Sequence, residues 1–305
     1  MRREKNILDV VAKSTAEAER ASRRGLILQS GALGDCILTL PLVEFMTKQI
    51  CPGGVDMMGH TDYLGILPSR SAAAAVRAME SVELHRLFVQ SSKFDVEEPD
   101  RLVQVFSQYE WIVTFLGEPG GDFEQNLLFA AHCGASSDVV TLALRPKKKT
   151  KSHVAEYHIL EFVDQSGLDI PQPQVQLNQQ FIKPGTGDIQ RGRELLKSAT
   201  EEDISRVIII HPGSGGREKC WFFENFYAIA EKLKQSGFFP VFLFGPAEQE
   251  RLDRELIGRA ENSFICFEGL KLEEVVGLLA CANGYVGNDS GVSHVAALAG
   301  TPSVP

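Results

Sequence analysis

The sequence predicts an α/β protein with two domains, each built on a parallel β-sheet covered by helices. Three observations lead to this prediction. The chain has 305 residues, which suits two domains of about 100–200 residues each. Short apolar runs alternate with segments of helical periodicity, and repeated strand–helix units bury parallel strands between helices. A polar segment from Ile170 to Gly187, punctuated by proline and glycine, predicts the domain linker.

The first domain is expected over residues 25–184, after a helical extension over residues 1–24. The predicted strands are 26–28, 55–59, 111–116 and 139–144, and the predicted helices are 36–49, 71–88, 98–108, 124–133 and 153–166. No apolar segment has the length of a signal peptide core or a membrane span. We therefore expect a cytoplasmic protein whose membrane association, if any, is peripheral.

The second domain is expected over residues 185–305. Its predicted strands are 207–210, 240–244, 264–267 and 285–286, and its predicted helices are 222–235, 247–259, 272–282 and 291–299. The last five residues look like the opening of one more buried strand. The domain is therefore expected to be incomplete at its C-terminus.

Composition excludes one class of function. The formal net charge is −9 and the isoelectric point about 5.4, which argues against non-specific nucleic-acid binding, because phosphates require a basic surface. The six cysteines form no CxxC pair, so we expect reduced, small core residues and no metal site.

The first motif is Gly31-Ala32-Leu33-Gly34-Asp35, between a predicted strand and a predicted helix. Gly31 and Gly34 allow a tight turn and a close approach of a ligand to the backbone. Asp35 lies at a helix N-terminus, where negative charge is favoured. The spacing alone fits a helix cap and a catalytic carboxylate equally well.

The second motif, His211-Pro212-Gly213-Ser214-Gly215-Gly216, also follows a predicted strand. Backbone N–H groups of such a loop can hold a phosphate, with Ser214, Gly215 and the nearby Lys219 in support. An ordinary glycine turn is the alternative, and His211 is as well explained as a buried residue at a strand end.

Two further motifs follow strands of the second domain. Glu248, in Gly-Pro-Ala-Glu, could bind ribose hydroxyls or cap a helix. Residues 287–294 lead from a strand into a helix of small residues, and Ser290 with the free N–H groups of that helix suits a pyrophosphate. Asp289 could orient sugar hydroxyls, and His294 lies four residues after Ser290, on nearly the same helix face. A capped, tightly packed helix is the alternative.

Together these motifs resemble those of glycosyltransferase family 9, the lipopolysaccharide heptosyltransferases. The similarity runs from Gly25 to the C-terminus and includes Lys219-Cys220-Trp221 and residues 287–304. It implies the GT-B architecture, in which two Rossmann-like domains face each other across the active site. It also implies inverting transfer of heptose from ADP-heptose, without a metal ion or other cofactor, to a lipid-linked or glycan acceptor at the inner face of the membrane.

The resemblance also implies roles for single residues. Asp35 corresponds to the general base, on the acceptor-side loop that holds Gly31 and Gly34. The donor-binding positions correspond to Ser214, Gly215, Lys219, Glu248, Asp289, Ser290, Gly291 and His294. Arg70, Arg77 and the lysines at 147–149 are candidates for contacts with a phosphorylated acceptor.

Other functions stay open at this point. One alternative is a GT-B transferase that uses a UDP- or GDP-linked sugar. Another is a non-catalytic nucleotide-sugar-binding protein or a truncated homologue. A dehydrogenase is disfavoured, because the GxGxxG motif of dinucleotide-binding proteins is missing. The sequence leaves the oligomeric state open.

Overall fold

The computed structural model describes residues 23–134, 136–146, 150–170, 179–201, 205–216, 218 and 220–304. The predicted extension over residues 1–24 lies outside this part of the chain except for its last two residues, and so do Lys219 and the lysines at 147–149. Among the described residues, contacts divide the chain into two compact units. The first contains 23–31 and 38–170, and the second contains 32–37 and 179–304.

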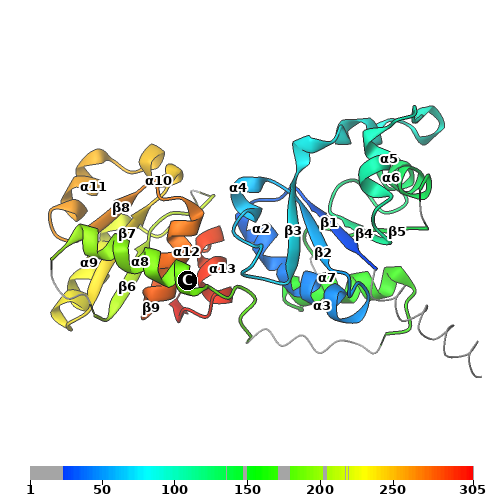
Figure 1. The fold of residues 1–305 in the computed structure, drawn as a ribbon. Helices are drawn as coiled ribbons and strands as arrows, with labels where there is room; N and C mark the ends of the chain where they lie inside the picture. The colour runs from blue at the N-terminus through cyan, green and yellow to red at the C-terminus, as the bar shows by residue number, and fades with distance from the viewer. Residues whose placement is uncertain are drawn as a thin grey trace, which may run out of the picture. The chain divides into compact units, whose positions relative to one another are not determined.

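The first unit contains a five-stranded parallel sheet (Figure 1). Its strands are β1 (Gly25–Gln29), β2 (Val55–Gly59), β3 (Ala73–Ala78), β4 (Trp111–Thr114) and β5 (Asp138–Thr141). Their order across the sheet is β3-β2-β1-β4-β5. The chain therefore winds outward from β1 to β3, and then returns to the other side of β1 with β4. The direction of winding reverses between β1 and β4.

Helices cover both faces of this sheet. The α-helices of this unit are α3 (Leu40–Gln49), α4 (Thr61–Leu64), α5 (Arg101–Phe106), α6 (Asp122–His132) and α7 (Val154–Ser166). Helix α2 (Leu33–Leu38) follows β1, but its residues 33–37 cluster with the second unit. Leu26 and Leu28 of β1 belong to the buried cluster that α5 and α6 complete. On α7, Phe162 packs edge-on against Phe45 of α3 and Trp111 of β4.

The helix predicted over residues 71–88 is wrong. The structure has β3 there, followed by three short 3₁₀ helices, η1 (Met79–Ser81), η2 (Leu84–Phe88) and η3 (Ser91–Lys93). The alanine run at 72–75 favours a helix locally, because alanine has the highest helix propensity. In the folded unit, β3 pairs along β2 from Val55↔Ala73 to Gly59↔Ala78, and this sheet pairing overrides the local preference.

The second unit contains another five-stranded parallel sheet. Its strands are β6 (Val207–His211), β7 (Phe239–Phe244), β8 (Ile265–Glu268), β9 (Gly284–Gly287) and β10 (Ser303–Val304). Their order is β10-β9-β6-β7-β8, so the winding direction reverses between β6 and β9. The strand expected near the end of the sequence is β10, which pairs with β9.

The helices of the second unit also lie on both faces of its sheet (Figure 1). They are α8 (Thr186–Ala199), α9 (Phe223–Gln235), α10 (Pro246–Arg251), α11 (Arg254–Glu261), α12 (Leu272–Cys281) and α13 (Gly291–Leu298). Ile208 and Ile210 of β6 pack in the buried cluster that α9 and α11 complete. The single helix predicted over 247–259 is in fact two, because the backbone of Leu252 is extended.

Helix α8 was not predicted from the sequence, and it packs closely on α12. A Cβ atom added to Gly192 of α8 would lie 2.1 Å from the carbonyl oxygen of Gly277 on α12. The thiol of Cys281 donates to the carbonyl of Ile189 at 3.2 Å. The two glycines allow the helix backbones to touch, which fixes α12 beneath the central strand β6.

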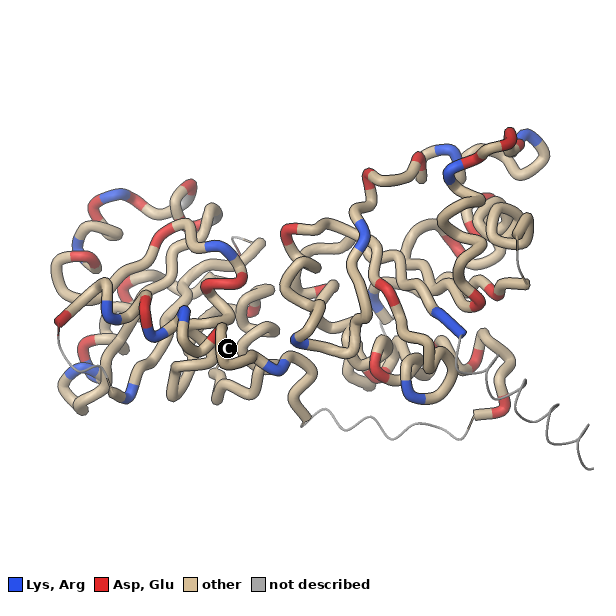
Figure 2. The backbone as a smooth tube through the Cα atoms, in the orientation of Figure 1, with Lys and Arg blue, Asp and Glu red and all other residues tan. Residues whose placement is uncertain are grey.

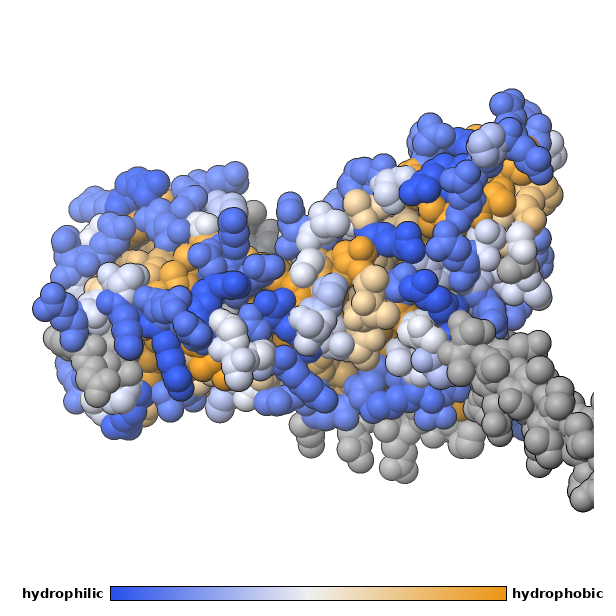
Figure 3. All heavy atoms as spheres, viewed as in Figure 1, coloured by the Kyte–Doolittle hydropathy of each residue, from blue (hydrophilic) through white to orange (hydrophobic). Residues whose placement is uncertain are grey.

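The surface carries charges of both signs over each unit (Figure 2). On the first unit, an apolar area lies over α5 and α6 (Figure 3). The exposed hydrophobic residues Phe88, Val89 and Phe129 of this unit are called the apolar patch below. The ring of Phe88 is tilted against that of Phe123, and the ring of Phe129 meets that of Phe94 edge-on. Within the described part of the chain, no helix is both long and apolar enough to cross a membrane.

All six cysteines are free. Cys36 and Cys51 are buried and Cys220, Cys266 and Cys281 are half-buried, but Cys133 is exposed, so the prediction that all six are core residues is wrong for Cys133. Burial is the main reason that the pKa values of Cys36, Cys51 and Cys266 rise to about 12. These thiols therefore stay protonated and unreactive at neutral pH.

A buried carboxylate holds the beginning of the first sheet together. Asp56 of β2 is fully buried, and its oxygens accept two hydrogen bonds from Arg24 at 2.8 and 2.9 Å and one from the Tyr109 hydroxyl at 2.7 Å. Arg77 of β3 adds a 3.5 Å contact, so this arginine, a candidate for the acceptor, pairs with Asp56. Burial and the bond to Asp56 raise the pKa of Tyr109, which keeps it a donor.

We predict that Asp56→Ala destabilises the first unit by about 2–4 kcal/mol, because it leaves Tyr109 and both arginines without their common partner. The value lies toward the lower end for buried ion pairs, since Arg24 and Arg77 keep about a third of their side chains exposed and can be hydrated. Urea unfolding followed by far-UV circular dichroism measures the change.

Glu110→Gln is the matched control in the same unit. Glu110 pairs with Arg23 at 3.2 Å, but both side chains are more than 40% exposed. Exposed pairs contribute about 0–1 kcal/mol, so this variant should unfold almost as the parent does. Equal losses in the two variants would show that the Asp56 cluster is no more important than a surface pair.

Candidate active site

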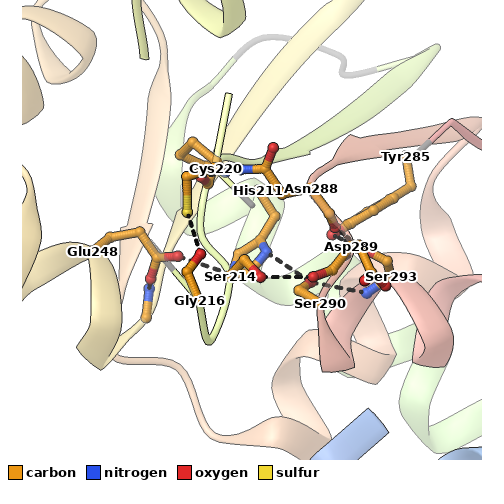
Figure 4. Close-up of polar contacts among 12 residues, drawn as sticks. His211, Ser214, Gly216, Cys220, Glu248, Tyr285, Asn288, Asp289, Ser290 and Ser293 are labelled. Atoms are coloured by element: carbon orange, nitrogen blue, oxygen red, sulfur yellow. Dashed lines mark hydrogen bonds and ion pairs between the residues drawn. The ribbon is translucent and has the colours of Figure 1, made fainter. Parts of the chain in front are cut away.

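The carboxyl ends of β6 and β9 lie side by side, and each is followed by a loop of polar and small residues. The strands pair in parallel from Ile208↔Gly284 to His211↔Gly287. Because the winding direction reverses here, the helices that follow the two strands leave toward opposite faces of the sheet. In open α/β sheets such a reversal opens a crevice in which ligands bind. Residues 212–216 and 288–290 meet at this crevice (Figure 4).

One side chain, Asn288, ties the loop after β6 at two points. Its amide nitrogen donates to the carbonyl of Pro212 at 2.6 Å, and its amide oxygen accepts the N–H of Trp221 at 2.9 Å. Asn288 itself is buried. Pro212 begins the glycine loop and Trp221 follows it, so a single buried amide holds the loop at both ends. The sequence motif contained Asn288, but we assigned it no role.

Ser214 joins the same two loops a third time. Its hydroxyl is buried and donates to the carbonyl of Asp289 at 2.6 Å. Gly215, the next residue, has open space around its Cβ position, with no atom within 4 Å. The loop therefore carries one anchored serine beside a glycine with open space at its Cβ position, which leaves room for a phosphate close to the backbone.

Helix α13 begins at this crevice with its N-cap serine. The Oγ atom of Ser290 accepts the N–H of Ser293 at 3.3 Å, and the hydroxyl of Ser293 donates to the carbonyl of Asn288. Tyr285 lies 3.0 Å from Ser293 Oγ, and burial raises the pKa of Tyr285 to about 12. These bonds fix the first turn of α13, whose remaining N–H groups give a partial positive charge.

The side chain of Glu248 occupies space that is available only because residue 213 is a glycine. A Cβ atom on Gly213 would lie 1.0 Å from Glu248 Oε1. The other oxygen of Glu248, Oε2, accepts the N–H of Gly245 at 2.7 Å, which caps α10. Oε1 is buried and accepts no hydrogen bond of good geometry among the described residues. Glu248 therefore does cap a helix, and it also presents an unsatisfied oxygen inside the site.

His211, the last residue of β6, lies between Glu248 and Ser290 (Figure 4). Its Nε2 atom is 3.3 Å from Glu248 Oε1, and its Nδ1 atom is 3.4 Å from Ser290 Oγ. Burial lowers the pKa of His211, although the carboxylate of Glu248 opposes the shift. The imidazole is therefore neutral at pH 7 in this structure.

Asp289 and His294 form the exposed part of the site. The carboxylate oxygen Oδ1 of Asp289 lies 3.6 Å from Nε2 of His294, and 59% and 30% of the two side chains are exposed. Gly291, the first residue of α13, lies between the two in the sequence. Among the side chains of this site described above, these two are the most exposed acid and base, so they can meet a hydroxylated ligand.

Asp35 occupies the third position of α2, at the corresponding edge of the first sheet. Its Oδ2 atom accepts the N–H of Ala32, the residue before the helix, at 3.1 Å. The backbone N–H of Gly31 donates to the side chain of Gln29 at 2.9 Å, which shapes the turn, and Gly34 lies within α2. The capping role of Asp35 is confirmed, whereas its catalytic role stays a prediction.

The comparison with known families decides the identity of the fold. Residues 135–305, more than half of the chain, match the family described as glycosyltransferase family 9 (heptosyltransferase). This chain belongs to glycosyltransferase family 9. It is therefore an enzyme of the glycosyltransferase class, EC 2.4. A search of curated proteins gave no match.

Solved structures agree with the family. A glycosyl transferase family 9 protein from Veillonella parvula has a TM-score of 0.67 and 18% identity, covering 92% of this chain and 79% of its own. The E. coli ADP-heptose LPS heptosyltransferase II has a TM-score of 0.64 and 19% identity, covering 92% of this chain and 83% of its own. The E. coli heptosyltransferase WaaC with ADP has a TM-score of 0.59 and 18% identity, covering 92% of this chain and 86% of its own. At these identities the likeness shows the fold, which is of the GT-B type.

The structure gathers six of the predicted donor positions of this family 9 chain around one crevice. They are Ser214, Gly215, Glu248, Asp289, Ser290 and His294. Gly291 opens the helix that leaves the crevice. Lys219 lies outside the described residues. Among the described residues, no cluster of three or more His, Cys, Asp or Glu is placed to hold a metal ion.

We predict that Gly213→Ala lowers the free energy of unfolding by about 1–3 kcal/mol, because the new Cβ would displace Glu248 from its buried position. Differential scanning calorimetry measures this change. Gly215→Ala is the matched control, because the same added atom meets nothing within 4 Å. If both variants melted together with the parent, Gly213 and Glu248 would not share one space.

Proposed function

We propose that this glycosyltransferase transfers a heptose from ADP-heptose to a glycan or lipid-linked acceptor, with inversion at the anomeric carbon. The observation that carries the proposal is the crevice between β6 and β9, where an anchored glycine loop and the start of α13 face the same space. Two of the similar structures are the E. coli heptosyltransferase WaaC with ADP and the E. coli ADP-heptose LPS heptosyltransferase II. The proposed donor domain is 185–305 and the proposed acceptor domain 25–184.

Donor binding follows from the groups at the crevice. The diphosphate would accept hydrogen bonds from the backbone N–H groups of the Gly215 loop and of the first turn of α13, with Ser214, Ser290 and Lys219 in support. A loop that is already tied to the β9–α13 turn by Ser214 and Asn288 needs little reorganisation when the diphosphate enters. No metal ion or other cofactor is part of the proposal.

The ribose and the sugar of the donor would bind to the two carboxylates at the crevice, Glu248 and Asp289. Glu248 Oε1 has no hydrogen-bond donor of good geometry among the described residues, and ribose hydroxyls are such donors. Both of its oxygens are covered, so the ribose would reach this carboxylate after a small local shift. The exposed pair Asp289 and His294 would hold hydroxyls of the sugar.

The reaction itself would use Asp35 as the general base. Asp35 takes the proton of an acceptor hydroxyl, and the oxygen attacks the anomeric carbon from the face opposite the diphosphate. The new carbon–oxygen bond forms as the bond to the diphosphate breaks, and ADP leaves with the bonding electrons. The helix α13 and Lys219 stabilise the charge that grows on the diphosphate.

A lipid-linked acceptor at a membrane surface is supported by the apolar patch. Phe88 and Phe129 each expose more than half of their side-chain surface. Exposed aromatic side chains on a protein without a membrane-spanning helix in its described part favour contact with amphiphilic molecules. The patch lies in the first unit, which makes up most of the proposed acceptor domain.

The donor assignment is tested by isothermal titration of the full chain with ADP, UDP and GDP. We expect ADP to bind at least about tenfold more tightly than the other two, which is about 1.4 kcal/mol. Transfer from ADP-heptose to a heptose-free lipopolysaccharide core, followed by mass spectrometry, then tests the activity. Tighter binding of UDP or GDP would reassign the donor. ADP binding with no transfer to any acceptor would indicate a binding protein.

We predict that Asp35→Ala lowers kcat by about 10²–10³ or more and leaves ADP affinity within about threefold, because the base acts only in the transition state. Steady-state kinetics and titration with ADP measure the two quantities. Asp35→Asn keeps the shape and a capping oxygen and should be equally inactive, so it separates the base from the cap. Normal turnover in either variant would remove Asp35 from the role.

A further inference from the structure

The hydrogen bonds that join His211, Ser290 and Ser293 at the crevice require one more hydrogen than these side chains supply. Ser293 uses its hydroxyl hydrogen on the carbonyl of Asn288, so the hydrogen in its 3.0 Å contact with Ser290 must come from Ser290. The 3.4 Å contact between Ser290 and His211 Nδ1 also needs a hydrogen. A hydroxyl has only one to give. Ser290 therefore serves two acceptors with a single hydrogen unless the ring supplies another.

The contact on the other side of the His211 ring determines which ring nitrogen carries the proton. Its Nε2 atom faces the carboxylate of Glu248 at 3.3 Å. In the neutral ring the proton is held there, since an unprotonated nitrogen would face a carboxylate oxygen with no hydrogen between them. Nδ1 is then an acceptor and cannot relieve the shortage at Ser290. A second proton, on Nδ1, would relieve it.

The charges around His211 also favour a second proton. Glu248 on α10 lies 3.3 Å from the ring, and its Oε1 atom accepts no hydrogen bond of good geometry among the described residues. Tyr285 on β9 stays neutral, and the more exposed Asp289 and His294 lie at the mouth of the site. Only burial holds the ring neutral, and a bound diphosphate would add negative charge beside Ser290.

We propose that His211 takes up one proton from solvent when the donor diphosphate binds, and that this proton releases the Ser290 hydroxyl to donate to a phosphate oxygen. The Nδ1–H then donates to Ser290 Oγ, which also accepts the N–H of Ser293. The Ser290 hydrogen turns away from the ring and from Ser293 to the diphosphate, while Ser293 Oγ keeps the hydrogen of the Tyr285 hydroxyl. The N–H bond formed on Nδ1 is the one covalent change. His211 is thus a positioning residue that acts through Ser290. This inference rests on the proposed function, because it needs a diphosphate at the crevice.

The sign of the pH dependence follows by linkage. A group whose pKa is higher in the complex than in the free protein takes up a proton on binding. Donor affinity therefore increases as the pH falls toward the pKa of free His211. Above the pKa of the complex, affinity falls by up to about tenfold per pH unit.

The test is isothermal titration with ADP-heptose, without acceptor, at pH 6.5 in buffers of different ionisation enthalpy. Both phosphates of this donor are esterified and do not titrate near neutral pH, so proton uptake reports on the protein. We expect an uptake of roughly half a proton or more per donor bound. His211→Gln should bind the donor about tenfold more weakly and take up less than about a tenth of a proton. Ser290→Ala removes the acceptor of the Nδ1–H, so it should bind the donor weakly and lose most of the uptake.

The outcomes separate this inference from the proposed function. Binding without proton uptake in the parent protein overturns the inference and leaves the donor assignment standing. No binding of ADP-heptose overturns both. Uptake that persists in His211→Gln and disappears in His294→Gln assigns the proton to His294, and so overturns the role of His211.

A second measurement uses the unaltered protein and does not depend on how a variant folds. Long-range ¹H–¹⁵N NMR spectra of the histidine rings distinguish the neutral ring from the cation. On addition of ADP-heptose at pH 6.5, the two ring nitrogens of His211 should shift to the values of an imidazolium. A ring that stays neutral at saturating donor overturns the proposal.

Discussion

The parallel pairing of β6 with β9 is the constraint on which the rest of the site depends. These strands are far apart in sequence, yet His211 and Gly287 end in register. The loops that follow them must therefore share one space, and the volume of that space is set by residues that lack side chains. Glu248 enters where Gly213 has no Cβ, and Tyr285 lies where Gly287 has none. The polar network of the crevice is a consequence of this packing.

Much of this arrangement could be predicted from the sequence. Short apolar strands alternating with helical segments specify parallel sheets, and each strand-end motif falls at the carboxyl edge where ligands bind. The positions of Ser214, Glu248 and Ser290 at one edge of the second sheet follow from that rule alone. The order of the strands does not, because the local pattern is the same whichever neighbour a strand pairs with.

The misses have identifiable physical causes. The alanine-rich residues of β3 favour a helix by propensity, and only their pairing with β2 makes them a strand. Helix α8 lies in a polar, glycine-containing segment, and its packing depends on contact between Gly192 and Gly277. The two hydrogen bonds of the Asn288 side chain join residues far apart in sequence, so no local sequence pattern predicts them. The roles assigned to Asp35 and Lys219 stay predictions.

Because Asn288 binds both Pro212 and Trp221, the two ends of the segment between them are fixed to the turn that follows β9. Substitutions or changes of length within it can alter what the segment recognises, while the two anchors and the turn that carries Asn288 stay the same. The framework and the recognition element can thus evolve at different rates. A family built on such a loop can acquire new ligand preferences without rebuilding its core.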